Sequence, residues 1–257
     1  MKVDLSRAAL DRTEVAYVAG AKRAYAAAWA RVRAALPRSQ SQTGGTHGDL
    51  NDPLVRRAIA ETLRQGLEQA AREAVAVLVT GAYVSKAAGP WAGGEKDPWA
   101  GWAGTGVPPV DPEALFARYT ANLDGVGGVK GMSDTALSDL ERAIQDFYAD
   151  PEMSMTDLEA RLAPYFSDWK ATQVGITETT RIATEDRRMV ADQLGVTTGT
   201  FDTSEDEDVC EECDPLDQTT VDLSDDSSMP PIHPGCRCGV SLDVSTDDGE
   251  NADIEGE

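Results

Sequence analysis

Five residues of types that bind metals in proteins are gathered near the end of this 257-residue chain. They are Cys210, Cys213, His233, Cys236 and Cys238, which include all four cysteines of the sequence and one of its two histidines. Zinc prefers thiolate and imidazole ligands, and a structural zinc site closes when four of them form a tetrahedron. The sequence therefore predicts a structural zinc site in this stretch.

The spacing of these residues supports a metal site because it repeats. Cys210-x2-Cys213 offers two ligands from one tight turn, and His233-Pro-Gly-Cys236 offers a second pair at the same spacing. Cys238 is a fifth candidate for four positions. The sequence leaves open whether Cys236 or Cys238 binds, or whether both bind and His233 does not. Buried free thiols and a disulfide formed in an extracellular particle are the alternatives to a metal.

The rest of the chain contains few residues that could act in catalysis. His47 lies in a polar linker, and the acidic run at 206–212 is typical of a solvated segment rather than a two-metal site. Glu178 is the most notable polar residue, and it could serve catalysis or a hydrogen bond between helices. No phosphate-binding glycine motif and no Ser/His/Asp arrangement occurs. We therefore expect a protein that is not an enzyme, with zinc as a structural cofactor.

The elements that must carry the cysteine cluster are mainly helical. Residues 1–36 are rich in alanine and predict an N-terminal helix, and residues 37–51 form a linker of Gly, Ser and Thr. Residues 52–132 predict a second helical region, which begins with an aspartate followed by proline, as helices often do. Within it, residues 87–110 carry three tryptophans among glycines and prolines, and they predict a long loop that docks on another subunit or on the chain itself.

Residues 133–196 predict the last group of helices. The first of these is expected to begin at Ser133 or Asp134, after a glycine-rich turn. A long helix is expected at 164–194, with Trp169 among the apolar residues of its buried face. This part of the chain leads directly into the cysteine cluster.

The sequence changes character after the long helix. Short β-branched segments at 196–203 and 239–244 predict two strands, one on each side of the zinc ligands. The acidic insert 214–232 between the ligand pairs is expected to be a mobile loop. We therefore predict a mainly α fold, in which an extended helical region is followed by a small C-terminal β/zinc module at 197–245 and an acidic tail at 246–257.

The net charge of −22 is concentrated at one end of the chain. Residues 201–257 contain 19 acidic residues and one basic residue, whereas residues 1–86 contain 13 basic and 8 acidic residues. Most of this surface would repel phosphate, so the composition excludes a general nucleic-acid binder and leaves only the basic N-terminal third to contact DNA. With 6 lysines against 17 arginines and 27 aspartates against 18 glutamates, the composition suits a halophilic source or a GC-rich genome.

Neither a membrane span nor a secretory signal is predicted. No run of about 18 apolar residues occurs. The N-terminal residues lack the apolar core and the small-residue cleavage site of a signal peptide. Without export, clustered cysteines are expected to hold a metal rather than to form disulfides.

The segment 230–238, PPIHPGCRC, resembles the ending of a family of phage proteins. In the phage Mu F-like head morphogenesis proteins, which include the SPP1-type minor head proteins, a PPxHPxCRC segment follows a C-x-x-C pair. In this chain the pair is Cys210 and Cys213. This is the most specific motif of the sequence.

A second stretch of the same family lies on a helix upstream. The family carries an I-x-x-T-E-T-like stretch, and this chain has VGITET at 174–179, followed by Arg181. Gly175 and Ile176 stand where the family usually has an Ala-Arg pair. The resemblance extends over roughly residues 133–243, so that 133–196 would be the helical part of a minor-head domain.

The resemblance implies a minor capsid protein of a tailed virus, associated with the portal and assisting head assembly or genome packaging and delivery. Its expected partners are the portal protein, the major capsid protein and viral DNA, with several copies around the portal. Its expected location is the virion head near the portal vertex, and the host cytoplasm during assembly. A halophilic archaeon and a GC-rich bacterium are both candidate hosts. A metal-dependent nuclease or other enzyme carried in the virion, and a non-viral zinc-binding adaptor, are the alternative functions.

Overall fold

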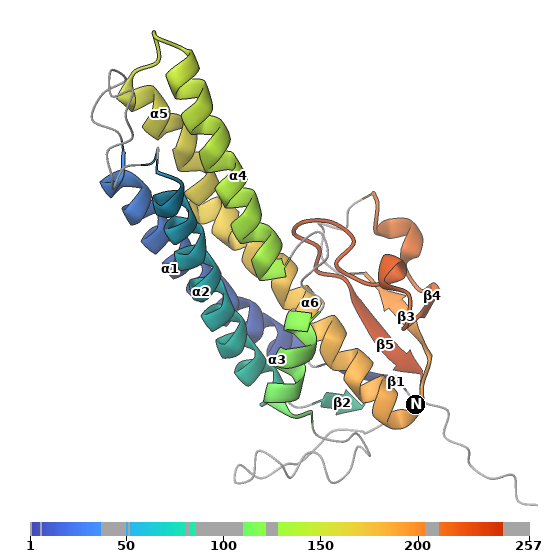
Figure 1. Cartoon of the computed structure of the whole chain (residues 1–257). Helices are drawn as coiled ribbons and strands as arrows, with labels where there is room; N and C mark the ends of the chain where they lie inside the picture. Colours follow the sequence, from blue (N-terminus) through green and yellow to red (C-terminus); the bar gives the residue numbers. More distant parts are fainter. Residues whose placement is uncertain are drawn as a thin grey trace, which may run out of the picture.

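The computed structural model describes residues 2–5, 7–36, 50, 52–80, 83–85, 110–121, 128–203 and 211–243. In this part of the chain the fold is mainly helical, with a small sheet beside the helices (Figure 1), so the predicted fold class is confirmed. Almost all of the predicted linker 37–51 and of the tryptophan-rich loop 87–110 lies outside the described residues. The acidic tail 246–257, His47 and Cys210 also lie outside them.

The helices of the described residues form an elongated bundle (Figure 1). They are α1 (Arg7–Ala34), α2 (Pro53–Val79), α3 (Pro112–Ala121), α4 (Gly128–Ala149), α5 (Met155–Leu162) and α6 (Asp168–Leu194), with the short 3-10 helices η3 (Ala163–Phe166), η4 (Asp214–Leu216) and η5 (Asp226–Ser228). α1 and α2 form a hairpin, α6 packs against α1, and α4 packs against α2. No helix among the described residues has the length and apolar character needed to cross a membrane.

Small residues let α1 and α2 lie very close together. A Cβ atom added to Gly20 would lie 2.5 Å from the Cβ of Ala70, and one added to Gly66 would lie 2.5 Å from the Cβ of Ala24. The alanine-rich face of α1, which is only weakly apolar in sequence, is therefore buried by close backbone approach rather than by large side chains. This packing supplies the partner surface that such a helix needs in order to be stable.

Local capping explains where several helices begin. The Asp52 side chain accepts a hydrogen bond of 2.8 Å from the amide of Leu54 at the start of α2. Ser154 forms a capping box with Asp157 at the start of α5. Gly195 ends α6 with a φ of 68°, a conformation that glycine adopts without steric cost.

α4 begins earlier than its sequence predicts. Its first residue is Gly128, so the expected start at Ser133 or Asp134 is wrong. Ser133, Ala136 and Leu140 are all buried and lie on one face of the helix. Packing of this face stabilises the first turns and outweighs the cost of about 1 kcal/mol for each glycine in a helix.

The predicted helix at 164–194 is in fact interrupted. The 3-10 helix η3 ends before Ser167, whose side chain caps α6 by accepting a hydrogen bond of 3.2 Å from the amide of Lys170. Trp169 is 69% exposed, so its predicted place in the core is wrong. Phe166 is buried instead and stacks on Trp29 of α1, with 5.9 Å between the ring centroids. The break at the cap changes which residues face the core.

The strands form one antiparallel sheet with the order β2-β1-β5-β3-β4. They are β1 (Lys2–Leu5), β2 (Tyr83–Ser85), β3 (Thr198–Asp202), β4 (Thr220–Asp222) and β5 (Gly239–Asp243). The predicted strands at 196–203 and 239–244 are confirmed as β3 and β5. Phe201 and Leu242 are fully buried and join the sheet to the core of the bundle.

The remaining strands correct two predictions. β1 lies in the segment 1–36, for which the sequence predicts a helix throughout, and Val3 pairs with Leu242 of β5. β4 lies in the acidic insert 214–232, so this insert is not a loop throughout. A two-stranded hairpin is marginally stable in water, and the added strands supply the missing partners.

Candidate metal centre

Three of the predicted ligands lie together beside the sheet. The Sγ atoms of Cys213, Cys236 and Cys238 lie within 4.8 Å of one another, and all three side chains are buried. The Sγ atoms of Cys213 and Cys236 are 3.9 Å apart. Two thiolates on one tetrahedral zinc ion lie about 3.8 Å apart, because the Zn–S bond is about 2.3 Å long. The cluster could therefore bind a metal without rearrangement of this pair.

His233 lies next to this cluster. Its Nε2 atom is 3.3 Å from the Sγ of Cys213, and its Nδ1 atom is 3.1 Å from the carbonyl oxygen of Pro234. A proton on Nδ1 donated to that carbonyl leaves the lone pair of Nε2 facing the sulfur. In metal sites, a hydrogen bond from the other ring nitrogen to a backbone carbonyl commonly orients the histidine.

Tight turns place the cysteines. After Cys213 the chain enters η4, and the amide of Leu216 donates to the carbonyl of Cys213 at 2.9 Å. The amide of Cys236 donates to the carbonyl of His233 at 3.2 Å, and Gly235 between them has a φ of 82° that favours glycine. The turn predicted for His233 and Cys236 is present, whereas the turn predicted for Cys210 and Cys213 is not tested, because Cys210 lies outside the described residues.

The cluster favours the charged form of one thiol. The hydrogen bond from Cys238, outweighing burial, lowers the pKa of Cys236 to about 5, and the nearby His233 acts in the same direction. A thiolate is the form of cysteine that binds metals. The chemistry of the donor set therefore fits a metal ion that prefers sulfur.

Helix α6 holds the segment 230–238 through three threonines, which are spaced three and four residues apart and so lie on one face of the helix. Thr177 Oγ1 accepts a hydrogen bond of 2.8 Å from the amide of Gly235. Thr180 donates to the carbonyl of Cys236 at 2.6 Å, and Thr184 donates to the carbonyl of Pro230 at 2.8 Å. These bonds satisfy backbone groups of a segment that has no regular secondary structure before β5.

A second anchor joins the same segment to α1. Arg237 donates two hydrogen bonds of 3.0 Å to the carboxylate oxygens of Glu14. Bidentate pairs of this kind fix the geometry of both side chains. Because Arg237 stands between Cys236 and Cys238, the anchor constrains both thiols.

Glu178 of α6 is buried and forms a hydrogen bond with a tyrosine of another helix. Its side chain is 2% exposed, and it accepts a hydrogen bond of 2.8 Å from the hydroxyl of Tyr119 on α3. That hydroxyl lies 3.3 Å from the hydroxyl of Tyr17 on α1. Burial, and secondly the charge of Glu178, raise the pKa of Tyr119, which therefore stays protonated and donates. The geometry matches the predicted hydrogen bond between helices.

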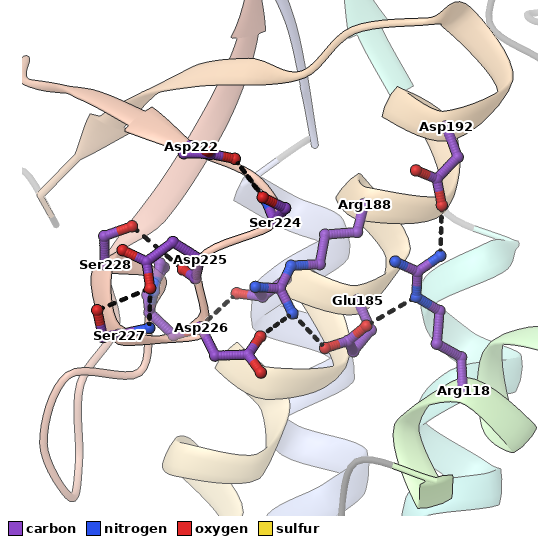
Figure 2. Close-up of polar contacts among 12 residues, drawn as sticks. Arg118, Glu185, Arg188, Asp192, Asp222, Ser224, Asp225, Asp226, Ser227 and Ser228 are labelled. Carbon is purple, nitrogen blue, oxygen red and sulfur yellow. Dashed lines mark hydrogen bonds and ion pairs between the residues drawn. The ribbon is translucent and has the colours of Figure 1, made fainter.

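A chain of ion pairs, which the sequence did not reveal, ties α6 to its neighbours (Figure 2). Glu185 of α6 is 2.9 Å from Arg118 of α3 and 3.1 Å from Arg188. Arg188 is also 2.6 Å from Asp226 of η5, and Arg118 is 2.6 Å from Asp192. Glu185 and Arg188 are three residues apart on α6, but no local pattern links them to Arg118 or Asp226.

The predicted acidic run supplies no candidate site in the described part of the chain. Glu211 and Glu212 are exposed, and residues 204–210 lie outside the described residues. Comparison with protein-family models, with curated proteins and with solved structures found no match. The function must therefore be inferred from the motifs and the contacts of the chain itself.

Proposed function

We propose that this chain is a minor capsid protein of a tailed virus, attached at the portal, whose C-terminal module is held by a structural zinc ion. The basis of the proposal is the resemblance of two motifs to the Mu F-like head morphogenesis proteins. In this role the helices provide the assembly surface, and the zinc fixes the module beside α6. Its partners are the portal protein and the major capsid protein.

The contact between the two motifs carries this proposal. The stretch 174–179 and the segment 230–238 are far apart in sequence, yet Thr177 and the following turn of α6 bind the backbone of 230–238. Chance matches to two separate motifs would have no reason to lie against each other. Their contact supports a single domain that spans both.

We propose that Cys213, His233, Cys236 and Cys238 are the four zinc ligands. The Sγ atoms of the three buried cysteines lie within 4.8 Å of one another, and Nε2 of His233 lies 3.3 Å from the Sγ atom of Cys213, so a Cys3His set like those of structural zinc sites is within reach. When all four positions are filled, none is left for water or substrate, so the metal would stabilise the fold rather than act in catalysis. Zinc would supply folding free energy to a segment with few apolar residues of its own.

Metal analysis tests the ligand set. The purified chain should contain close to one zinc ion per molecule by mass spectrometry of the intact protein and by elemental analysis. Cys236→Ser and His233→Ala should lose most of this zinc, whereas Cys210→Ser should retain it. Loss of zinc from Cys210→Ser with retention by His233→Ala would show that Cys210 holds the fourth position instead.

Portal binding tests the viral role. The chain is co-expressed with the portal protein encoded in the same genome, and the complex is isolated on a tag carried by the portal. We expect the chain to co-elute with the portal oligomer and to be detected in purified particles. A chain that stays in the unbound fraction and is absent from particles would refute the proposal. Hydrolysis of DNA by the zinc-loaded chain would instead favour the nuclease alternative.

A further inference from the structure

Two thiols of the cysteine cluster lie close enough to bond to each other as well as to a metal. The Sγ atoms of Cys213 and Cys236 are 3.9 Å apart. A disulfide bond is about 2.05 Å long, so a shift of about 1 Å by each sulfur atom would join them. This pair connects two separate segments of the chain, whereas Cys236 and Cys238 are two residues apart on one segment.

The backbone that carries the two thiols is held without a metal. Thr180 donates a hydrogen bond of 2.6 Å to the carbonyl of Cys236, and the next residue, Arg237, forms its bidentate pair with Glu14. The carbonyl of Cys213 accepts a backbone hydrogen bond of 2.9 Å at the start of η4. None of these bonds involves a sulfur atom. They therefore keep the two cysteines near each other when a metal leaves.

A small oxidant has a route to this pair. Cys213 and Cys236 are each 1% exposed, which excludes bulky oxidants. His233, whose Nε2 atom is 3.3 Å from the Sγ of Cys213, is only partly buried and lines a groove of about 670 Å³ between α4 and α6. A molecule as small as hydrogen peroxide can therefore reach the sulfur atoms past the imidazole ring.

We propose that the cluster is a redox switch, in which a hydroperoxide replaces the zinc ion by a disulfide between Cys213 and Cys236. The inference rests on the proposed zinc site. Reducing surroundings favour the thiolates and therefore the metal, whereas oxidising surroundings favour the disulfide. In a virion, the zinc form would belong to assembly in the host cytoplasm and the disulfide form to the released particle. Both forms tie the same two segments together, so the module stays folded in each.

The chemical step balances with hydrogen peroxide as the oxidant. One thiolate attacks an oxygen of the peroxide, the O–O bond breaks, and a sulfenic acid and a hydroxide ion form. The second thiolate attacks the sulfenic sulfur, so that the S–S bond forms and a second hydroxide ion leaves. Each hydroxide takes up a proton and becomes water, and the peroxide gains the two electrons that the thiolates lose. Loss of two of the four ligands releases the zinc ion, and the thiolate of Cys238 takes up a proton.

Peroxide treatment of the full-length, zinc-loaded chain tests the switch. We expect loss of most of the bound zinc, measured with a chromogenic chelator, and a mass lower by two hydrogen atoms than that of the reduced, metal-free chain. Digestion with trypsin and with a protease that cleaves at acidic residues should yield peptides joined through Cys213 and Cys236. Acidic residues and Arg237 separate these two cysteines from the others, so the pairing can be assigned. A thiol reductant with added zinc should restore the zinc content.

Cys210→Ser is the matched control, because it removes a thiol outside the pair. It should lose zinc and form the same disulfide as the wild-type chain. In the oxidised chain, hydrogen–deuterium exchange of β3 and β5 should stay as slow as with zinc bound, whereas the chelated, reduced chain should exchange faster.

The outcomes separate the switch from the zinc site itself. Zinc that stays bound under peroxide, oxidation to sulfinic acid without a disulfide, or a disulfide to Cys210 would overturn the switch and leave the zinc site standing. Fast exchange of β3 and β5 in the oxidised chain would overturn it as well. A purified chain without zinc would refute the zinc site, and the switch with it.

Discussion

At the scale of single residues, Gly175 shows how closely α1 and α6 approach each other. A Cβ atom at this position would lie 2.5 Å from Cγ2 of Val18 and 2.9 Å from its Cα. Real Cβ atoms do not approach so closely, and the backbone of α1 cannot move as easily as the end of a side chain. Glycine is therefore needed where α1 crosses α6, because even the methyl group of alanine would not fit in this packing.

Gly175→Ala should destabilise the chain by about 1–3 kcal/mol, because α1 and α6 must separate to accept the methyl group. The better helix propensity of alanine offsets at most about 1 kcal/mol of this loss. Urea denaturation measures the difference. Combining it with Val18→Ala should recover part of the loss, since that change removes the nearest Cγ2 atom. A more stable Gly175→Ala variant would mean that the helices lie further apart than described.

Asp186 gives the chain a pH-dependent stability. Its side chain is 1% exposed, and burial raises its pKa to about 7, against a smaller opposing effect of Arg187. At pH values between the pKa of Asp186 in the unfolded chain and its pKa in the folded chain, the folded chain keeps a proton on Asp186 that the unfolded chain has lost. The resulting stabilisation is complete below the unfolded pKa and is lost as the pH rises through about 7.

Asp186→Asn should remove this dependence. Between pH 5.5 and 7 the wild-type chain should lose stability relative to the variant, by at most about 1.4 kcal/mol per pH unit, and the difference should level off above that range. Urea denaturation over a pH series measures it. Asp168→Asn, which removes an exposed carboxylate from the same helix, is the control and should follow the wild-type profile. Parallel profiles for wild type and Asp186→Asn would show that Asp186 is ionised in the folded chain.

At the scale of elements, a helix or strand could be predicted from the sequence where adjacent residues determine it. The start of α2 at Asp52 and the strands β3 and β5 could be predicted, because a cap or a β-branched run is a property of adjacent residues. β1, β2 and β4 are only three or four residues long, and each is stabilised by pairing with a neighbouring strand. The early start of α4 likewise depends on a surface that α4 covers rather than on its own residues.

The members of the ion-pair chain in Figure 2 should contribute unequally to the free energy of unfolding. Glu185 is 5% exposed and lies between Arg118 and Arg188, so Glu185→Gln leaves two guanidinium groups without their shared carboxylate. We expect a loss of about 1–3 kcal/mol. Asp226 is 84% exposed, and Asp226→Ala should cost about 0–1 kcal/mol. Thermal or urea denaturation compares them, and an equal or larger loss for Asp226→Ala would contradict this order.

At the scale of the whole molecule, the cysteine cluster binds together parts of the chain that the sequence presents as separate. Its spacing predicted a metal site, and the structure places three of the five candidate ligands together, with His233 beside them. What spacing could not predict is the support of the cluster. The segment 230–238 is held by α6 and α1, and β5 is flanked by β1 from the other end of the chain. Contacts at such separation leave no local pattern.

Metal removal should therefore loosen more than the C-terminal module while leaving the bundle intact. In the chelator-treated chain and in Cys213→Ser, hydrogen–deuterium exchange should accelerate in β3, β4 and β5, and also in β1, which pairs with β5. α1, α2 and α4 should exchange as before, because their buried faces pack on one another. Zinc added back should restore protection in the chelated chain but not in Cys213→Ser. Faster exchange throughout α1 and α2 would show instead that the helices depend on the metal. Unchanged exchange in β1 would show that its pairing with β5 does not couple the two ends of the chain.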